Sequence, residues 1–149
     1  MAIETIGVVG GGAWGTALAQ VAAKAGRTVH LWAREPEVAE SINTLFENTA
    51  FLKGVPLSPA VRATNRLDDL ADADTLLLVT PAQFLRATLA QLGDHLPRST
   101  PLVLCSKGIE QGTGLLMTEV CNAVAGEHPL AVLSGPTFAA EVARGLPTA

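Results

Sequence analysis

The chain has 149 residues, of which 48% are hydrophobic and 16% are charged, and this composition excludes an intrinsically disordered protein. A formal net charge of -4 and a pI of about 5.3 are not typical of a nucleic-acid-binding domain. The length is that of one domain with a core of its own.

Short apolar runs rich in β-branched residues alternate with helical patterns along the whole chain. Most of these runs are continuous, which is typical of parallel strands covered on both faces. We expect strands at Thr5–Val9, Thr28–Trp32, Val61–Thr64, Thr75–Val79, Pro101–Leu104 and Leu130–Leu133, and helices at Ala13–Ala25, Pro36–Glu47, Pro81–Leu92, Thr113–Ala125 and Pro136–Arg144, with a turn near Leu67–Ala71. This alternation predicts an α/β fold of the Rossmann type, with a doubly wound, mostly parallel sheet and helices on both faces.

Proline and glycine mark the expected helix ends. Pro36, Pro81 and Pro136 stand where the first turn of a helix tolerates proline. Gly26 stands where a helix ends in the left-handed conformation. The last residues, EVARGLPTA, carry no polar tail and are typical of the approach to another strand, so we expect further protein beyond them.

The first expected strand leads into the segment VVGGGAWGTALA, in which Gly10, Gly12 and Gly15 form a GxGxxG motif. Gly10 would make the tight turn, Gly12 would let a pyrophosphate approach the backbone, and Gly15 would let the helix pack closely on the strand. The N-terminus of that helix offers unpaired N–H groups to an anion. Trp14 has two open roles, because it could cover the pyrophosphate or pack against the next loop.

The second expected strand, TVHLWAR, ends in Ala33 and Arg34, where an NAD-binding chain would carry an acid for the ribose. Arg34 suits a 2′-phosphate and adenine stacking, so the sequence favours NADP, with a solvated surface arginine as the alternative. Glu35 and Glu37 fit the acidic first turn of the next helix.

Three further candidate sites follow later strands at the ligand-binding edge of such a sheet, the first of them at Val79-Thr80-Pro81. Lys107 would place a cation beside the nicotinamide end, although an exposed loop lysine is the commoner outcome. The segment SGPTFA would begin a helix that accepts an anion, or Ser134 or Thr137 would simply be its N-cap.

Cys105 and Cys121 form no CxxC pair and no metal-ligand spacing with a histidine, so we expect two buried free thiols and no metal. No apolar run reaches the ~18 residues of a membrane span, and MAIETIGVV lacks the basic start of a signal peptide. We therefore expect a cytoplasmic protein with no membrane span and no nucleic-acid partner.

Four segments together, GGGAWGTALA, NTAFLKGVPL, SKGIE and LSGPTFAAEVARGLPTA, resemble the bacterial NAD(P)-dependent glycerol-3-phosphate dehydrogenases. The resemblance implies hydride transfer between NAD(P)H and dihydroxyacetone phosphate, giving sn-glycerol 3-phosphate for phospholipid synthesis. It implies cofactor contacts at the motif glycines and at Ala13, Trp14, Arg34, Lys107 and Ala139, and substrate contacts at Lys107, Gly135 and Thr137. Ala13 is often serine in the family, and Lys53 and Ser58 replace common prolines.

The resemblance also implies that residues 1–149 are the dinucleotide-binding domain of a two-domain enzyme. The family's helical C-terminal domain, with the lysine thought to transfer the proton, lies outside these residues, so we expect no catalytic residue here and no turnover by the chain alone. The oligomeric state of the full-length enzyme stays open, with a homodimer as one candidate. Two further activities stay open as well: an NADP-dependent reductase of a keto acid, against which GPTFA argues, and a non-catalytic NADP-binding module.

Overall fold

The computed structural model describes residues 2–93 and 95–148, and it contains one six-stranded sheet in the order β3-β2-β1-β4-β5-β6. Every neighbouring pair of strands is parallel. The strands are β1 (Thr5–Val9), β2 (Thr28–Trp32), β3 (Val61–Thr64), β4 (Thr75–Leu78), β5 (Leu102–Leu104) and β6 (Leu130–Val132). The chain runs outward from β1 to β3, returns to pair β4 with β1, and then continues to β6, which confirms the predicted doubly wound sheet.

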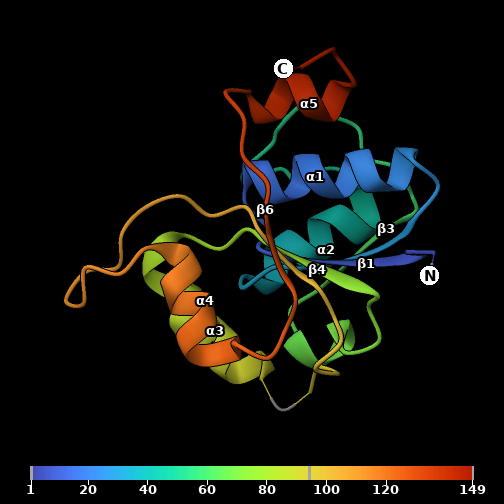
Figure 1. The fold of residues 1–149 in the computed structure, drawn as a ribbon. Helices are drawn as coiled ribbons and strands as arrows, with labels where there is room; N and C mark the ends of the chain where they lie inside the picture. The colour runs from blue at the N-terminus through green and yellow to red at the C-terminus, as the bar shows by residue number, and fades with distance from the viewer. Residues whose placement is uncertain (1, 94, 149) are drawn as a thin grey trace.

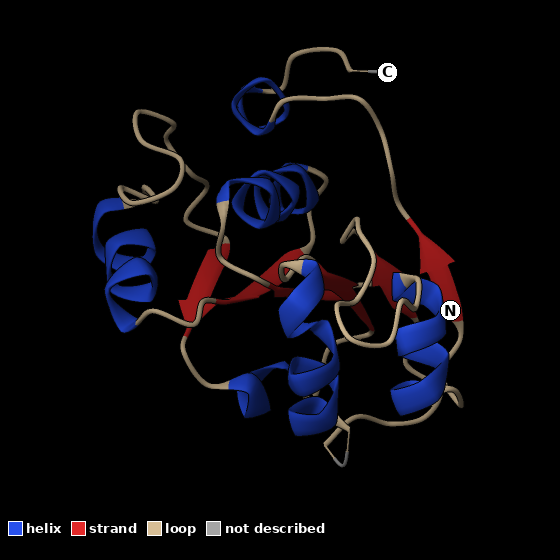
Figure 2. Cartoon of the chain, turned by 90° about the vertical axis from the view of Figure 1, so that its left-hand side faces the viewer, coloured by secondary structure: helices blue, strands red, loops and turns tan. Residues whose placement is uncertain are grey.

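The helices form layers on both faces of this sheet (Figures 1 and 2). The α-helices are α1 (Ala13–Lys24), α2 (Pro36–Leu45), α3 (Leu85–Leu92), α4 (Met117–Ala125) and α5 (Ala139–Arg144), and short 3-10 helices are η1 (Leu67–Leu70) and η2 (Ala82–Phe84). One apolar cluster joins α1 and α2 to one face, and another joins η1, α3 and α4 to the other. Helix α5 packs on α1, outside the first layer (Figure 2).

The central strand β1 shows why the strand sequences are continuously apolar. Val8 and Val9 are both fully buried, and because successive side chains point to opposite faces, each belongs to a different apolar cluster. Val8 lies beside Leu31 and Leu77 of the neighbouring strands. Covering both faces of the sheet therefore favours apolar residues at successive positions of the central strands, as the sequence indicated.

Left-handed residues follow the ends of α1, α2 and α5. After α1, Gly26 has φ +79°, and its N–H and that of Arg27 donate to the carbonyls of Ala23 and Ala22, as predicted for this glycine. Helix α2 ends two residues earlier than expected, because Phe46 adopts a left-handed conformation with φ 52°.

Three predicted helix starts were wrong. Pro81 is extended, with ψ 145°, and the expected single helix is instead a short 3-10 helix, η2, followed by α3. Helix α4 begins at Met117 rather than Thr113, because Gly112 and Gly114 are left-handed. Helix α5 begins at Ala139 rather than Pro136, because Phe138 is extended. Pro36 alone among the three prolines opens its helix.

Cys105 and Cys121 are buried free thiols, and burial raises the pKa of each to about 11. No helix in the described part of the chain is long and apolar enough to cross a membrane. Residues 146–148 form no strand, and Ala149, the end of the strand approach expected there, lies outside the described residues.

Candidate functional site

The turn between β1 and α1 can be made only with glycine at two of the motif positions. Gly10 has φ +131°, and a Cβ there would lie 2.9 Å from the carbonyl of Val79. A Cβ on Gly15 would lie 1.8 Å from the Gly10 oxygen, so α1 packs directly on the turn. Both conformational roles predicted for these glycines are confirmed.

Gly12 differs from its neighbours because space is open around it. No atom lies within 4 Å of the position that a Cβ on Gly12 would take. Gly12 is the N-cap of α1 and provides no side chain to pair with the first N–H groups of the helix. The N-terminus of this twelve-residue helix therefore presents donors and partial positive charge to open space, which suits a phosphate.

A cleft of about 680 Å³ begins at this turn and runs along the carboxyl ends of β1, β2 and β4. Strands β2 and β4 lie on opposite sides of β1, so the direction in which strands are added to the sheet switches at β1. The cleft lies at this switch point, which is the usual ligand position in such sheets. Its size is that of a small-molecule or cofactor site. The lining includes all five predicted residues of the glycine turn and also Arg34: Gly10, Gly12, Ala13, Trp14, Gly15 and Arg34.

Arg34 lies against an aromatic ring that sequence reasoning missed. Its guanidinium carbon is 5.6 Å from the ring centroid of Phe84, in the geometry of a cation–π contact. Both side chains are exposed and line the cleft. Glu35, which the sequence assigned to the first turn of α2, also lines the cleft and makes no capping hydrogen bond.

Asn48 is a second residue of the site that the sequence did not single out. Its side chain is fully buried and donates to the Gly11 carbonyl at 2.9 Å and to the Thr16 hydroxyl at 2.8 Å. Its side-chain carbonyl accepts the Phe51 N–H at 3.0 Å. Asn48 thus ties the loop after α2 to the glycine turn. The only sequence signal was its place at the start of the segment NTAFLKGVPL.

Trp14 lies between the cleft and the loop that follows α2. It packs against an apolar cluster that includes Leu52 and Val55 of that loop, as one of its two predicted roles required. It also lines the cleft, so it is placed beside any ligand there.

A smaller recess of about 320 Å³ adjoins the cleft and shares Ala13 and Trp14 with it. The recess brings together every predicted substrate residue, which are Lys107, Gly135 and Thr137, and also Ala139. Lys107 is exposed, and its Nζ donates to the Gly135 carbonyl at 3.4 Å. The two predicted groups of site residues therefore form neighbouring parts of one surface.

The alternative that Ser134 or Thr137 caps the last helix was wrong. Helix α5 begins at Ala139, its N-cap is the extended Phe138, and no side chain caps it. Ser134 to Thr137 instead form an irregular segment between β6 and α5. Gly135 and Thr137 contribute to the recess from that segment and not from a helix N-terminus.

Comparison with known proteins agrees with this geometry. The sequence model described as "NAD-dependent glycerol-3-phosphate dehydrogenase N-terminus" matches residues 5–149. The chain is 60% identical over 146 residues to the glycerol-3-phosphate dehydrogenase [NAD(P)+] of Hyphomonas neptunium, covering 98% of the chain and 44% of that relative. It is 58% identical over 149 residues to the enzyme of the same name from Parvibaculum lavamentivorans, covering 100% and 45%.

A solved structure shows the same likeness in three dimensions. The crystal structure of glycerol-3-phosphate dehydrogenase from Coxiella burnetii is 31% identical, has a TM-score of 0.90, and is matched over 98% of this chain and 45% of that one. The chain thus spans less than half the length of these relatives. From the glycine turn, the topology and these matches together, the chain belongs to the NAD-dependent glycerol-3-phosphate dehydrogenase family and corresponds to its N-terminal part.

Proposed function

We propose that residues 1–149 form the dinucleotide-binding domain of an NAD(P)-dependent sn-glycerol-3-phosphate dehydrogenase. The observation that carries this proposal is that the cleft and the recess adjoin. The cleft that begins at the glycine turn shares Ala13 and Trp14 with the recess that holds Lys107. A dinucleotide along the cleft would therefore end beside a cation, which suits hydride transfer to a phosphorylated carbonyl compound.

The described residues fit such a cofactor at both ends. The open space at Gly12 and the uncapped N-terminus of α1 suit a pyrophosphate. Arg34 and Phe84 provide a charged and an aromatic surface for the adenosine end. We assign cofactor contacts to Gly10, Gly12, Ala13, Trp14, Gly15, Arg34, Lys107 and Ala139, and expect the domain to bind both NADP and NAD.

The bound nicotinamide would supply or accept the hydride, while this chain binds and orients the reactants. Lys107 would attract the anionic substrate and polarise its carbonyl, with Gly135 and Thr137 completing that wall of the recess. We assign no catalytic acid or base to this chain. The substrates would be dihydroxyacetone phosphate and sn-glycerol 3-phosphate, and the reaction would serve phospholipid synthesis in the cytoplasm.

Binding and turnover should separate in this chain. We expect the 149-residue chain to bind NADPH, measured by the fluorescence of the nicotinamide, and to show no reduction of dihydroxyacetone phosphate. A Gly12→Val variant should lose binding, because its side chain would occupy the open space at the turn. Substantial turnover by the chain alone would contradict the assignment of essential groups outside it, and absence of NADPH binding would contradict the proposed function.

A further inference from the structure

The connection between β5 and α4, residues 105–116, carries Lys107 but has little regular structure of its own. It includes three left-handed glycines, which are Gly108, Gly112 and Gly114, and one isolated bridge between Ile109 and Leu116. A loop of this kind orders a side chain only where it is fixed to a rigid element. Its fixed points therefore decide where Lys107 lies.

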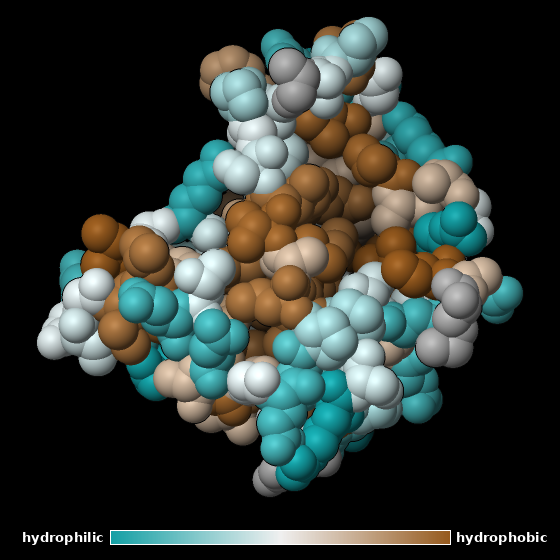
Figure 3. Space-filling model, in the orientation of Figure 1, coloured by the Kyte–Doolittle hydropathy of each residue, from teal (hydrophilic) through white to brown (hydrophobic). Residues whose placement is uncertain are grey.

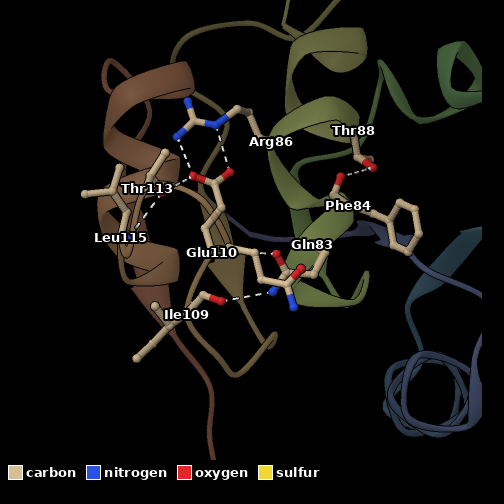
Figure 4. Close-up of polar contacts among 9 residues, drawn as sticks. Gln83, Phe84, Arg86, Thr88, Ile109, Glu110, Thr113 and Leu115 are labelled. Carbon is tan, nitrogen blue, oxygen red and sulfur yellow. Dashed lines mark hydrogen bonds and ion pairs between the residues drawn. The ribbon is translucent and has the colours of Figure 1, made fainter.

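The strongest fixed point is a charged pair with α3, shown in Figure 4. The carboxylate of Glu110 accepts two hydrogen bonds from Arg86, from Nε at 2.8 Å and from Nη2 at 2.9 Å. The Thr113 hydroxyl donates to the same carboxylate at 2.5 Å. Glu110 is 9% exposed, although its neighbours in the loop are exposed. This planar, bidentate geometry is specific to arginine and is stronger than a point contact.

Gln83 of η2 holds the backbone on both sides of Glu110. Its Nε2 donates to the Ile109 carbonyl at 2.9 Å, and its Oε1 accepts the Gln111 N–H at 2.8 Å. The loop is therefore fixed to the η2–α3 segment at three consecutive residues, 109 to 111. The same segment contributes Phe84 to the cleft, so the loop and the cleft share one support.

Lys107 lies between this attachment and a second one. On its other side, the Ser106 hydroxyl donates to the Thr80 carbonyl at 2.5 Å and lies 3.3 Å from the Leu78 carbonyl. Between the two attachments, Gly108 has φ +137°, and a Cβ there would lie 3.1 Å from that of Ala82. The backbone from 106 to 110 is thus held at both ends, and the Lys107 ammonium group between them reaches the carbonyl of Gly135.

We propose that Arg86 and Glu110 are positioning residues for Lys107. They hold the loop on α3 so that the Lys107 ammonium group stays at the wall of the recess, near Gly135 and Thr137. This inference rests on the proposed function, because it needs Lys107 to act on the substrate. A small displacement of a group that orients a substrate costs up to about a hundredfold in rate, so loss of the pair should lower activity.

A double-mutant cycle in the full-length dehydrogenase that contains this chain tests the proposal. The variants are Lys107→Ala, Glu110→Gln and the double variant, and the readouts are kcat and KM for dihydroxyacetone phosphate and the Kd for NADPH. We expect each single variant to lower kcat/KM about tenfold or more. Glu110→Gln should change the NADPH Kd no more than Lys107→Ala does, and it should cost nothing further once Lys107 is alanine.

Glu127→Gln is the matched control, because Glu127 pairs with Arg98 on the exposed surface and should leave every kinetic constant unchanged. Thermal unfolding shows whether each variant folds, and Arg86→Lys replaces Glu110→Gln in the cycle if that variant does not. Additive losses in the double variant would overturn the positioning role while leaving the proposed role of Lys107 intact. A Lys107→Ala enzyme within about twofold of wild type would overturn both.

Discussion

At the scale of single residues, we expect Arg34 to decide which cofactor the cleft prefers. Arg34 and Glu35 are the two charged side chains of the cleft lining, and Arg34 lies on the ring of Phe84. We expect Arg34→Ala to weaken NADPH binding about tenfold, or about 1.4 kcal/mol, because the 2′-phosphate loses its cation and faces Glu35 alone. NADH binding should barely change. The measurement is the Kd of both cofactors.

Arg62→Ala is the control for this prediction, because Arg62 is an exposed arginine of β3 outside both parts of the site. Raised salt should weaken NADPH binding more than NADH binding in the wild type, since screening acts on the extra phosphate. An equal loss for both cofactors in Arg34→Ala would mean that Arg34 only stacks on the adenine.

Residue types at strand ends could be predicted from the sequence, but their partners could not. Arg34 and Lys107 were predicted because the strands before them have local signatures, whereas Gly135 was assigned to the site by the family resemblance. The ring beneath Arg34 and the buried Asn48 were missed, since Asn48 meets Gly11 across 37 positions of the chain. Such pairs depend on how the helices pack, and one sequence contains no pattern for that.

At the scale of elements, strands were predicted more accurately than helix starts. Strands follow from buried apolar runs, and all six lie within one residue of their predicted bounds. Two of the predicted helices start at Pro81 and Pro136, but proline fixes φ and leaves ψ free. Pro81 is extended, with ψ 145°, and the helical structure begins only after it.

The attachment of the β5–α4 loop to α3 should depend on pH. Hydrogen bonds from Arg86 and then from Thr113 lower the pKa of Glu110 to about 2, below the ordinary value of about 4.3. Because the folded-state pKa is depressed, this contribution to stability is complete above about 4.3 and is lost as the pH falls towards about 2. We expect Glu110→Gln to lower the urea midpoint at pH 7 and to lower it progressively less at more acidic pH.

Glu127→Gln again provides the comparison, because it removes the same charge from an exposed pair and should change the midpoint little at any pH. A destabilisation by Glu110→Gln that stays constant from pH 7 to about pH 2 would show that packing, and not the ionised carboxylate, holds the loop.

At the scale of the whole molecule, the sheet of the described residues ends in the exposed strand β6. Strand β6 pairs only with β5 among the described strands, and Val132 is 62% exposed. Figure 3 shows apolar side chains gathered in the hollow centre of the face on which β6 lies. An open apolar edge strand is a template for pairing with another chain.

We therefore expect the 149-residue chain to self-associate as its concentration rises, and Val132→Lys to reduce that association by placing a charge on the edge. Light scattering after gel filtration measures it. Val21→Lys is the control, since Val21 is an exposed valine of α1 and not of the sheet edge. A wild-type chain that stays monomeric at every concentration would contradict this prediction.

The central place of β1 also sets the order in which the protein can be built during synthesis. Its first neighbour, β2, follows soon after it in the chain. The buried residues of one apolar cluster all come from the segment from β1 to β3, and Leu77 and Val79 only pack against that cluster. The second neighbour of β1 is β4, and just before that strand the Asp74 carboxylate accepts the N–H groups of Glu4 and Thr5 across 70 and 69 positions. Closing so long a loop is slow compared with local pairing. As the chain leaves the ribosome, the N-terminal half can pack first. The edge of β1 that pairs with β4 then stays unpaired until residue 78 has emerged.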